Sequence, residues 1–290
     1  MIFARVEERR TEYPVAVVGR VPGVSRSGYY AGTKRPPGDT ARRRDRLAGT
    51  IRAIHDEPYL DTHGSPRRTR EWTARGVACC VNTAAKVMSE AGIRARATRR
   101  VVRTTDSRHG RPVSESVLDR EFAAAKPNQK WVMDLTYVPT QEGWLFPAVV
   151  VDLFSRRIVG WATAATATSR LVVDALAMAV SRRGAVAGVI AHSDRGSQYA
   201  SDHLQSELRR HRMVGGTRGV GQCWDNAVIE STFGRMKVEW TRGERYPTRD
   251  EAKASLVGDI EGFYNRARRH STVGHLTPDE VERTHNPDSR

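Results

Sequence analysis

Three acidic residues are the candidates for chemistry in this chain, because each lies in a segment whose pattern places it on a regular element. Asp134 lies in the middle of WVMDLTYV, where apolar residues alternate as in a strand. Asp194 ends the apolar run AVAGVIAHSD, just before the loop RGSQY, and functional groups of open α/β sheets gather at such strand ends. Glu230 lies in GQCWDNAVIESTFGRMKVEW, whose apolar residues repeat at helical spacing.

These carboxylates together suit phosphodiester transfer. Carboxylate oxygens are ligands that Mg²⁺ and Mn²⁺ prefer, and two such ions about 3.5–4 Å apart can activate an attacking oxygen and stabilise a leaving oxygen. A buried carboxylate without a partner is costly, which favours a shared cation over isolated acids. Each acid also has a structural alternative: Asp134 could pair with an arginine, Asp194 could only begin a turn, and Glu230 could be an ordinary surface acid.

The segment that carries Glu230 has one apolar stripe, formed by Ile229, Phe233, Met236 and Trp240. The stripe predicts a helix docked on a core, and Glu230, about 100° round from Ile229, lies at the edge of its buried face. Lys237 follows seven residues after Glu230, almost along the same side. A carboxylate with a cation two turns further on suits a metal site beside a phosphate backbone. Asp225 or Asn226 can cap the start of the helix.

The segments around these acids predict a sheet with helices laid against it, an α/β fold. The expected strands, the first three in succession as an antiparallel meander, are 131–138, 146–154, 158–162 and 185–194. The expected helices are 169–183, 201–211 and 227–240. Ser169 is expected to cap the first of these helices, and Gly184 lies just past its end.

The first third of the chain predicts short helices separated by turns. A helix over 41–60 places Leu47, Ile51 and Ile54 on one side, and further helices are expected at 69–75 and 83–90. Such helices could form a helix-turn-helix DNA reader or a small bundle with a basic solvated face, and the pattern does not choose between them. The basic, turn-rich stretch that follows could track phosphates or serve as an exposed tether.

The charge balance points to a polyanionic partner. The 290 residues carry 48 Lys plus Arg against 33 Asp plus Glu, a formal charge of +15. Residues 1–125 hold 11 of these excess positive charges, residues 126–230 hold 3 and residues 231–290 hold 1. Arginine makes up 42 of the 48 basic residues, which suits bidentate phosphate contacts and would also follow from a GC-rich genome.

Several classes of protein are disfavoured by the composition. The chain has no run of about 18 apolar residues, and charges interrupt its first twenty residues, so we expect a cytoplasmic protein that does not enter a membrane. Cys79, Cys80 and Cys223 form neither a CxxC pair nor an even set, so structural zinc and disulfides are not expected.

Five sequence motifs, in a fixed order, carry a family resemblance: WVMDLTYV, VVVDLFSRRIVGWA, HSDRGSQYAS, DNAVIESTFGRMKVE and YNRARRHSTVGHLTPDEVE. In these motifs the chain resembles the OrfB-type transposases of the insertion-sequence-three family, within the DDE transposases and retroviral integrases. The 35 residues between Asp194 and Glu230, and Lys237 seven residues further on, match the spacing of this group. The resemblance implies a ribonuclease-H-like integrase core, preceded by a small all-α, helix-turn-helix-like region.

The resemblance also implies roles for individual residues. Asp134, Asp194 and Glu230 would be the catalytic, metal-binding triad, and Lys237 would contact DNA near the transposon end. The residues near the site in the family motifs, expected to support it or to contact DNA, are His192, Arg195, Ser197, Gln198 and Asn226. Asp152 lies outside the triad and is expected to be structural.

The function implied by the resemblance is DNA cleavage and strand transfer at the ends of an insertion sequence, through a circular intermediate and with two Mg²⁺ (or Mn²⁺) ions. The expected partners are terminal-repeat and target DNA, further copies of the chain on DNA, and an OrfA protein from an upstream reading frame, often joined by frameshifting. The expected location is the cytoplasm, in association with the nucleoid. Two alternatives stay open: a ribonuclease-H-like nuclease that cuts without joining, and an inactive DNA-binding regulator.

The C-terminal segment predicts a helical extension of the core. Thr248 with Glu251 and Thr277 with Glu280 form capping-box patterns, and Pro278 takes the favoured first helical position. Between them is a basic cluster that could grip phosphates or stack on a flipped base, or form a solvated turn: Tyr264, Arg266, Arg268, Arg269 and His270.

The expected division of the chain has four parts, in order a helix-turn-helix-like DNA-binding region, a basic linker, the integrase catalytic core and its helical extension: residues 1–93, 94–125, 126–240 and 241–290. The chain departs from similar sequences at Arg68, where an apolar residue is usual, and at Gly32, where an aromatic residue is usual. Both departures predict weak packing of the N-terminal helices.

Overall fold

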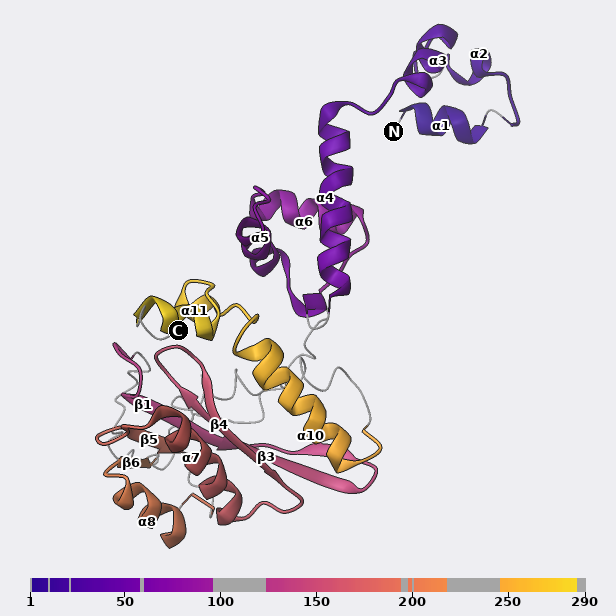
Figure 1. Ribbon diagram of the computed structural model, residues 1–290. Helices are drawn as coiled ribbons and strands as arrows, with labels where there is room; N and C mark the ends of the chain where they lie inside the picture. The colour runs from indigo at the N-terminus through magenta and orange to yellow at the C-terminus, as the bar shows by residue number, and fades with distance from the viewer. Residues whose placement is uncertain are drawn as a thin grey trace, which may run out of the picture.

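A computed structural model describes residues 2–9, 11–20, 22–57, 60–95, 124–193, 198–199, 201–217 and 246–285. Helices occupy the first third, a mixed sheet with helices forms the middle, and further helices follow it (Figure 1). The predicted fold class, an α/β core preceded by an all-α region, is confirmed.

The sheet has β1 at its centre. Its strands are β1 (Lys130–Leu135), β2 (Val138–Thr140), β3 (Gly143–Asp152), β4 (Ile158–Ala164), β5 (Ile190–Ser193) and β6 (Val214–Thr217). Their order is β2-β3-β1-β5-β6, with β4 paired to β3. The β1–β3 and β3–β4 pairs are antiparallel, whereas β1–β5 and β5–β6 are parallel.

The predicted strands are largely confirmed, with three differences. The expected strand over 131–138 divides into β1 and β2, although both pair with β3. The expected strand over 185–194 is ordered as a strand only over β5, because Gly188 adopts a φ of +82° before it. β6 was not predicted, and its sequence Val-Gly-Gly-Thr has no alternating pattern that would indicate it.

Both faces of the sheet are buried. On one face, Trp131 and Met133 pack against helices α7 (Ser169–Arg183) and α8 (Asp202–Arg210). On the other face, Val132 and Val138 pack against α10 (Arg249–Val257). The alternation predicted for this strand is therefore correct, and α7 has the predicted bounds. Its N-cap is Thr168 rather than Ser169, and no side-chain hydrogen bond caps it.

Helix α7 approaches β4 closely at Gly160. A Cβ atom at this position would lie 2.3 Å from the carbonyl oxygen of Ala175 and 2.6 Å from the amide nitrogen of Ala179. Real Cβ atoms do not approach backbone atoms so closely. Glycine here lets the helix lie directly on the strand.

The first third of the chain forms two groups of helices. Helices α1 (Ile2–Arg9), α2 (Val15–Val18) and α3 (Arg26–Lys34) lie apart from the rest in Figure 1. Residues 39–90, here called the α4–α6 unit, contain α4 (Asp39–Asp56), the short helix η1 (Leu60–Thr62), α5 (Ser65–Ala74) and α6 (Val81–Glu90). The helix predicted in the stretch 41–60, with Pro58 marking its end, is confirmed as α4, which ends at Asp56 and buries Leu47, Ile51 and Ile54.

Arg68 is fully buried inside the α4–α6 unit, and the unit is well packed around it. Its guanidinium donates to the carbonyl oxygens of His63 at 2.7 Å, Leu60 at 3.3 Å and Ile51 at 3.4 Å. A buried cation is tolerated where its donors are satisfied, so the expected weak packing is wrong at this position. Gly32 falls inside α3 and does not interrupt that helix.

The C-terminal segment continues α10 as a π-helix, η3 (Gly258–Tyr264), and then forms η4 (Ser271–Val273) and α11 (Pro278–His285). Thr277 and Glu280 form the predicted capping box in full: the Glu280 amide donates to Thr277 Oγ1 at 3.2 Å, and the Thr277 amide donates to Glu280 Oε2 at 2.7 Å. Thr248 accepts from the Glu251 amide at 3.1 Å. Pro278 begins α11 as predicted.

The contact at Gly160 makes a direct test of the packing of α7 on the sheet. Replacing Gly160 by Ala should lower the free energy of unfolding by about 3 kcal/mol, because backbone atoms of α7 cannot yield to the new Cβ. Urea unfolding followed by circular dichroism measures this.

Gly49→Ala is the matched control, because Gly49 is exposed in α4 and a Cβ there meets nothing within 4 Å. It should raise the free energy of unfolding by about 0.5–1 kcal/mol. Equal stability of the two variants would contradict the close helix–strand contact.

Candidate active site

Asp134 lies near the carboxyl end of the central strand. It is half-buried on β1, and its Cα partner on β3 is Val149. The backbone amide of Leu135 donates to Asp134 Oδ1 at 2.7 Å, which orients the carboxylate. A carboxylate oxygen is thus held in place at this edge of the sheet.

The parallel pair β1–β5 brings two chain positions together at this edge. The pairing runs from Lys130 with Ile190 to Met133 with Ser193, and each strand continues with an aspartate in the sequence, Asp134 and Asp194. Because the strands run in the same direction, their carboxyl ends meet at one edge of the sheet.

The remaining predicted residues lie outside the described residues and are Asp194, Arg195, Ser197, Asn226, Glu230 and Lys237. Among the residues that are described, no group of three or more His, Cys, Asp or Glu side chains could hold a metal ion. Asp134 is the member of the predicted triad whose surroundings can be described.

Side chains around the end of β5 are anchored in the core. His192 is buried on β5, with Val132 of β1 and Gly216 of β6 as its Cα partners. Gln198 Nε2 donates to the carbonyl oxygen of Ala167 at 3.2 Å, and Tyr199 packs into the core beneath α7 and α8. That His192 and Gln198 support the site stays a prediction.

Asp152 is a structural carboxylate, as expected. It is fully buried, and its two oxygens accept from the amides of Asn128 and Phe154, each at 2.9 Å, while Arg183 lies 3.6 Å away. Burial raises the pKa of Asp152 above its usual value, although the amides and Arg183 oppose the shift. Its oxygens are used to hold the turn between β3 and β4.

The basic cluster 264–270 is mostly turned inward. Arg266 is exposed. Arg268 is buried, 3.1 Å from the His270 ring nitrogens and 5.4 Å from the ring centre of Tyr264, which is itself buried. Arg269 is also buried and bonds to carboxylates of the protein. Tyr264 is too deeply buried to stack on a flipped base. Of the three arginines, only Arg266 is exposed and could contact a phosphate.

Sequence reasoning missed Asn265, which joins the C-terminal segment to the sheet. Its side chain accepts from the Ile158 amide and donates to the Ile158 carbonyl oxygen, both at 3.0 Å. A single asparagine in a basic stretch has no pattern that distinguishes it, so only the folded chain identifies this residue.

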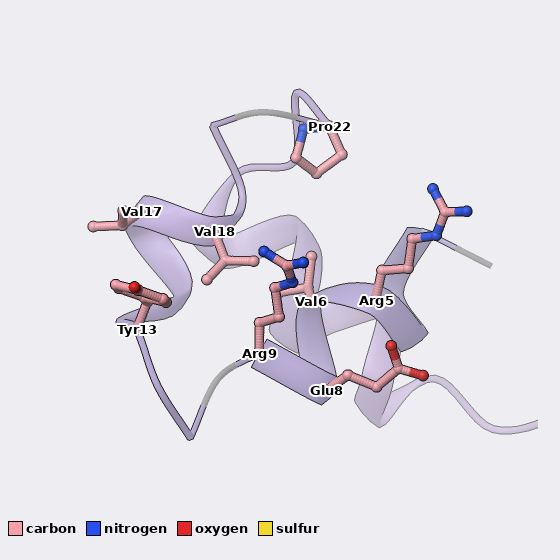
Figure 2. A pocket seen from close by; sticks show the side chains of 8 residues that line it. All are labelled: Arg5, Val6, Glu8, Arg9, Tyr13, Val17, Val18 and Pro22. Atoms are coloured by element: carbon pink, nitrogen blue, oxygen red, sulfur yellow. The ribbon is translucent and has the colours of Figure 1, made fainter.

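A cavity of about 710 Å³ lies in the first helices, far along the chain from Asp134. Its lining side chains come from α1, the segment before α2, α2 and the turn after it (Figure 2). Val6, Val18 and Pro22 form apolar walls, with Arg5 and Arg9 beside them. Glu8 is the one carboxylate among these residues, so the cavity does not fit the predicted metal chemistry.

The sheet, with an aspartate at the carboxyl end of its central strand, defines the class of protein. The integrase core domain family matches residues 124–223, and a second integrase core domain family matches residues 217–278. This class consists of metal-dependent polynucleotidyl transferases, so the chain is an enzyme of the DDE type.

Relatives that match almost the whole chain identify the family within this class. The chain is 39% identical over 284 residues to the transposase InsF for insertion sequence IS3A of Escherichia coli strain K12, covering 97% of this chain and 98% of the relative. It is 38% identical over 259 residues to a 31 kDa protein of insertion element IS600 of Shigella sonnei, covering 89% and 95%. The chain belongs to the insertion-sequence-three family of transposases.

Solved structures are also similar to parts of the chain. The HTLV-2 integrase catalytic core domain in complex with magnesium has 19% identity and a TM-score of 0.40, covering 54% of this chain and 97% of that one. A simian T-cell lymphotropic virus intasome has 17% identity and a TM-score of 0.47, covering 77% and 72%. Within the part of the chain that the structure describes, no helix has the length and apolar character needed to cross a membrane.

The contrast between Asp152 and Asp134 leads to a stability test. Asp152→Ala should lower the free energy of unfolding by about 3 kcal/mol, because two partly buried amides lose their acceptor and Arg183 loses a nearby carboxylate. Asp134→Asn should change it by less than about 1 kcal/mol, because the amide oxygen of Asn can still accept from Leu135. Urea unfolding of both variants measures the difference. Equal losses would contradict the assignment of a structural role to Asp152 alone.

Proposed function

We propose that this transposase cuts and joins DNA at the ends of its insertion sequence, with Asp134, Asp194 and Glu230 as the ligands of two Mg²⁺ or Mn²⁺ ions. The observation that carries the proposal is the register of the parallel pair β1–β5, whose last pair precedes an aspartate on each strand. The three side chains offer the hard oxygen donors that these ions prefer.

The residues of the chain would divide the work as follows. Asp134, held by the Leu135 amide, would keep a fixed ligand oxygen at the strand edge. Bound metal ions would supply activation of the attacking water or 3′-hydroxyl and charge stabilisation at the departing oxygen. Lys237, Arg195 and Asn226 would contact the DNA backbone beside the site, and Arg266 would add a phosphate contact from the exposed side of the extension.

The α4–α6 unit is the proposed DNA reader. Helices α5 and α6 pack on each other, α6 packs on α4, and Arg68 of α5 bonds the Ile51 carbonyl oxygen of α4, an arrangement that fits a helix-turn-helix. The exposed face of α6 carries Asn82, Lys86 and Ser89, side chains that can hydrogen-bond to base edges or phosphates. Four exposed arginines of α4, which could attract the phosphate backbone, are Arg42, Arg43, Arg44 and Arg46.

The wider assembly is part of the same proposal. Terminal repeats and target DNA would be held by more than one copy of the chain, with an OrfA protein supplied from an upstream frame. The four-part division at residues 93, 125 and 240 remains a prediction, as do the use of two ions and the association with the nucleoid.

A strand-transfer assay with labelled element ends and Mg²⁺ tests this function. The wild type should give joined product, and Asp134→Asn, Asp194→Asn and Glu230→Gln should each reduce it to the level seen with EDTA, because each removes a charged metal ligand. Asp174→Asn is the control, since Asp174 is an exposed carboxylate on α7 paired with Arg170. It should join like the wild type.

The other outcomes identify the alternatives. Cleavage without joined product would favour a ribonuclease-H-like nuclease, and binding without cleavage would favour a DNA-binding regulator. Joining that survived all three substitutions would show that the triad is wrongly assigned.

A further inference from the structure

The α4–α6 unit is packed against the C-terminal segment that follows α10 (Figure 1). Phe263 of the π-helix is 3% exposed and belongs to the same apolar core as Ile51, Ile54 and Trp72 of the unit. The ring centres of Phe263 and His63 are 6.2 Å apart. An aromatic side chain from the far end of the sequence thus completes the core of the proposed DNA reader.

A line of ion pairs crosses the same contact. Arg269 Nε donates to Glu71 Oε2 of α5 at 3.0 Å, and Arg269 Nη1 lies 3.3 Å from Glu280 Oε2 of α11. Glu71 also accepts from Arg75 at 2.7 Å, and Arg75 bonds Glu57 through two nitrogens at 2.6 and 2.9 Å. The side chains of Arg269 and Glu71 are only 10% and 13% exposed, so water and salt screen this pair weakly.

The His63 ring adds no positive charge to this contact. The ring is fully buried, and burial together with the charges of Arg67, Arg268, Arg68 and Arg269 lowers the pKa of His63 to about 3. The ring is therefore neutral near pH 7. The contact combines a neutral apolar centre with a paired charged rim.

The same C-terminal segment, residues 258–282, also bonds to the sheet and to the turn before β4. Asn265 bonds both backbone groups of Ile158 on β4. Asp279 pairs with Arg157, and Glu282 accepts from Ser155 at 2.7 Å. Residues 258–282, here called the C-terminal clamp, thus hold the α4–α6 unit and the sheet that carries Asp134.

We propose that Glu71 and Arg269 are positioning residues of the transposition reaction, because they set where the DNA reader lies relative to the carboxylate edge. The distance between the DNA terminal repeat on the reader and Asp134 would then be fixed, and this distance would determine which phosphodiester bond is cut. This inference rests on the function proposed above. Neither residue touches the reacting atoms; each acts through the clamp.

The test uses the full chain on a labelled duplex containing one element end. Cleavage position, cleavage rate and binding affinity are measured for Glu71→Arg, Arg269→Glu and the double variant. Each single variant should bind the duplex within about threefold of the wild type but lose about 100-fold in cleavage rate at the wild-type bond, with cuts spread to neighbouring bonds, because misplacement by about 1 Å has that effect. The double variant restores opposite charges between positions 71 and 269 but places like charges beside Arg75 and Glu280, so it should recover only part of the cleavage at the wild-type bond.

Two further variants keep the test decisive. Glu71→Gln retains the shape of the side chain and removes its charge, so it should show the same change in cut position if Glu71→Arg does not fold. Arg283→Glu is the matched charge-reversal control, because Arg283 is exposed on α11 and, among the residues that the structure describes, its side chain bonds a carbonyl of its own helix. It should cut like the wild type.

The results that would overturn the inference are specific. Single variants that bind the duplex and cut the wild-type bond at the wild-type rate would contradict the positioning role while leaving the transposase function intact. A wild type that binds but never cuts would overturn the proposed function and the positioning role together.

Discussion

The parallel pairing of β1 with β5 is the constraint on which the proposed chemistry depends. Acids that follow the carboxyl ends of two adjacent parallel strands lie at the same edge of the sheet, where they can share a cation. Parallel strands of this kind are buried on both faces, and here α7 and α8 cover one face while α10 covers the other. Because position 160 is glycine, α7 lies directly on the sheet whose central strand carries Asp134.

We assign different roles to two carboxylates of this core, a structural role to Asp152 and a proposed metal-binding role to Asp134. Asp152 is fully buried, and its two oxygens accept from backbone amides, with Arg183 nearby as its cationic partner. Asp134 accepts from the next amide in the chain at the half-buried edge. The C-terminal clamp contacts both parts of the chain, because Asn265 bonds to the sheet and Arg269 bonds to α5. The clamp thus connects the proposed DNA reader to the sheet that carries Asp134.

The sequence pattern predicts a residue's role where that role depends on residues nearby in the sequence. The alternation around Asp134, the bounds of α7 and the capping box at Thr277 follow from local periodicity and local hydrogen bonds. Arg68, Arg268 and Arg269 could not be placed this way, because an arginine in a basic segment looks the same whether it meets a phosphate or a buried carbonyl. The partners of Arg68 lie 5 to 17 residues away in sequence, and Glu71 lies 198 residues from Arg269.

The most direct measurement of the central claim is Fe²⁺-directed cleavage of the protein backbone, with Fe²⁺ replacing Mg²⁺ and ascorbate with peroxide generating radicals at the bound ion. Fragments mapped by mass spectrometry should show cuts near residues 134, 194 and 230 together, suppressed by excess Mg²⁺ and by Asp134→Asn. Cuts near one or none of these positions, or a pattern unaffected by Asp134→Asn, would contradict a metal site built on the paired ends of β1 and β5.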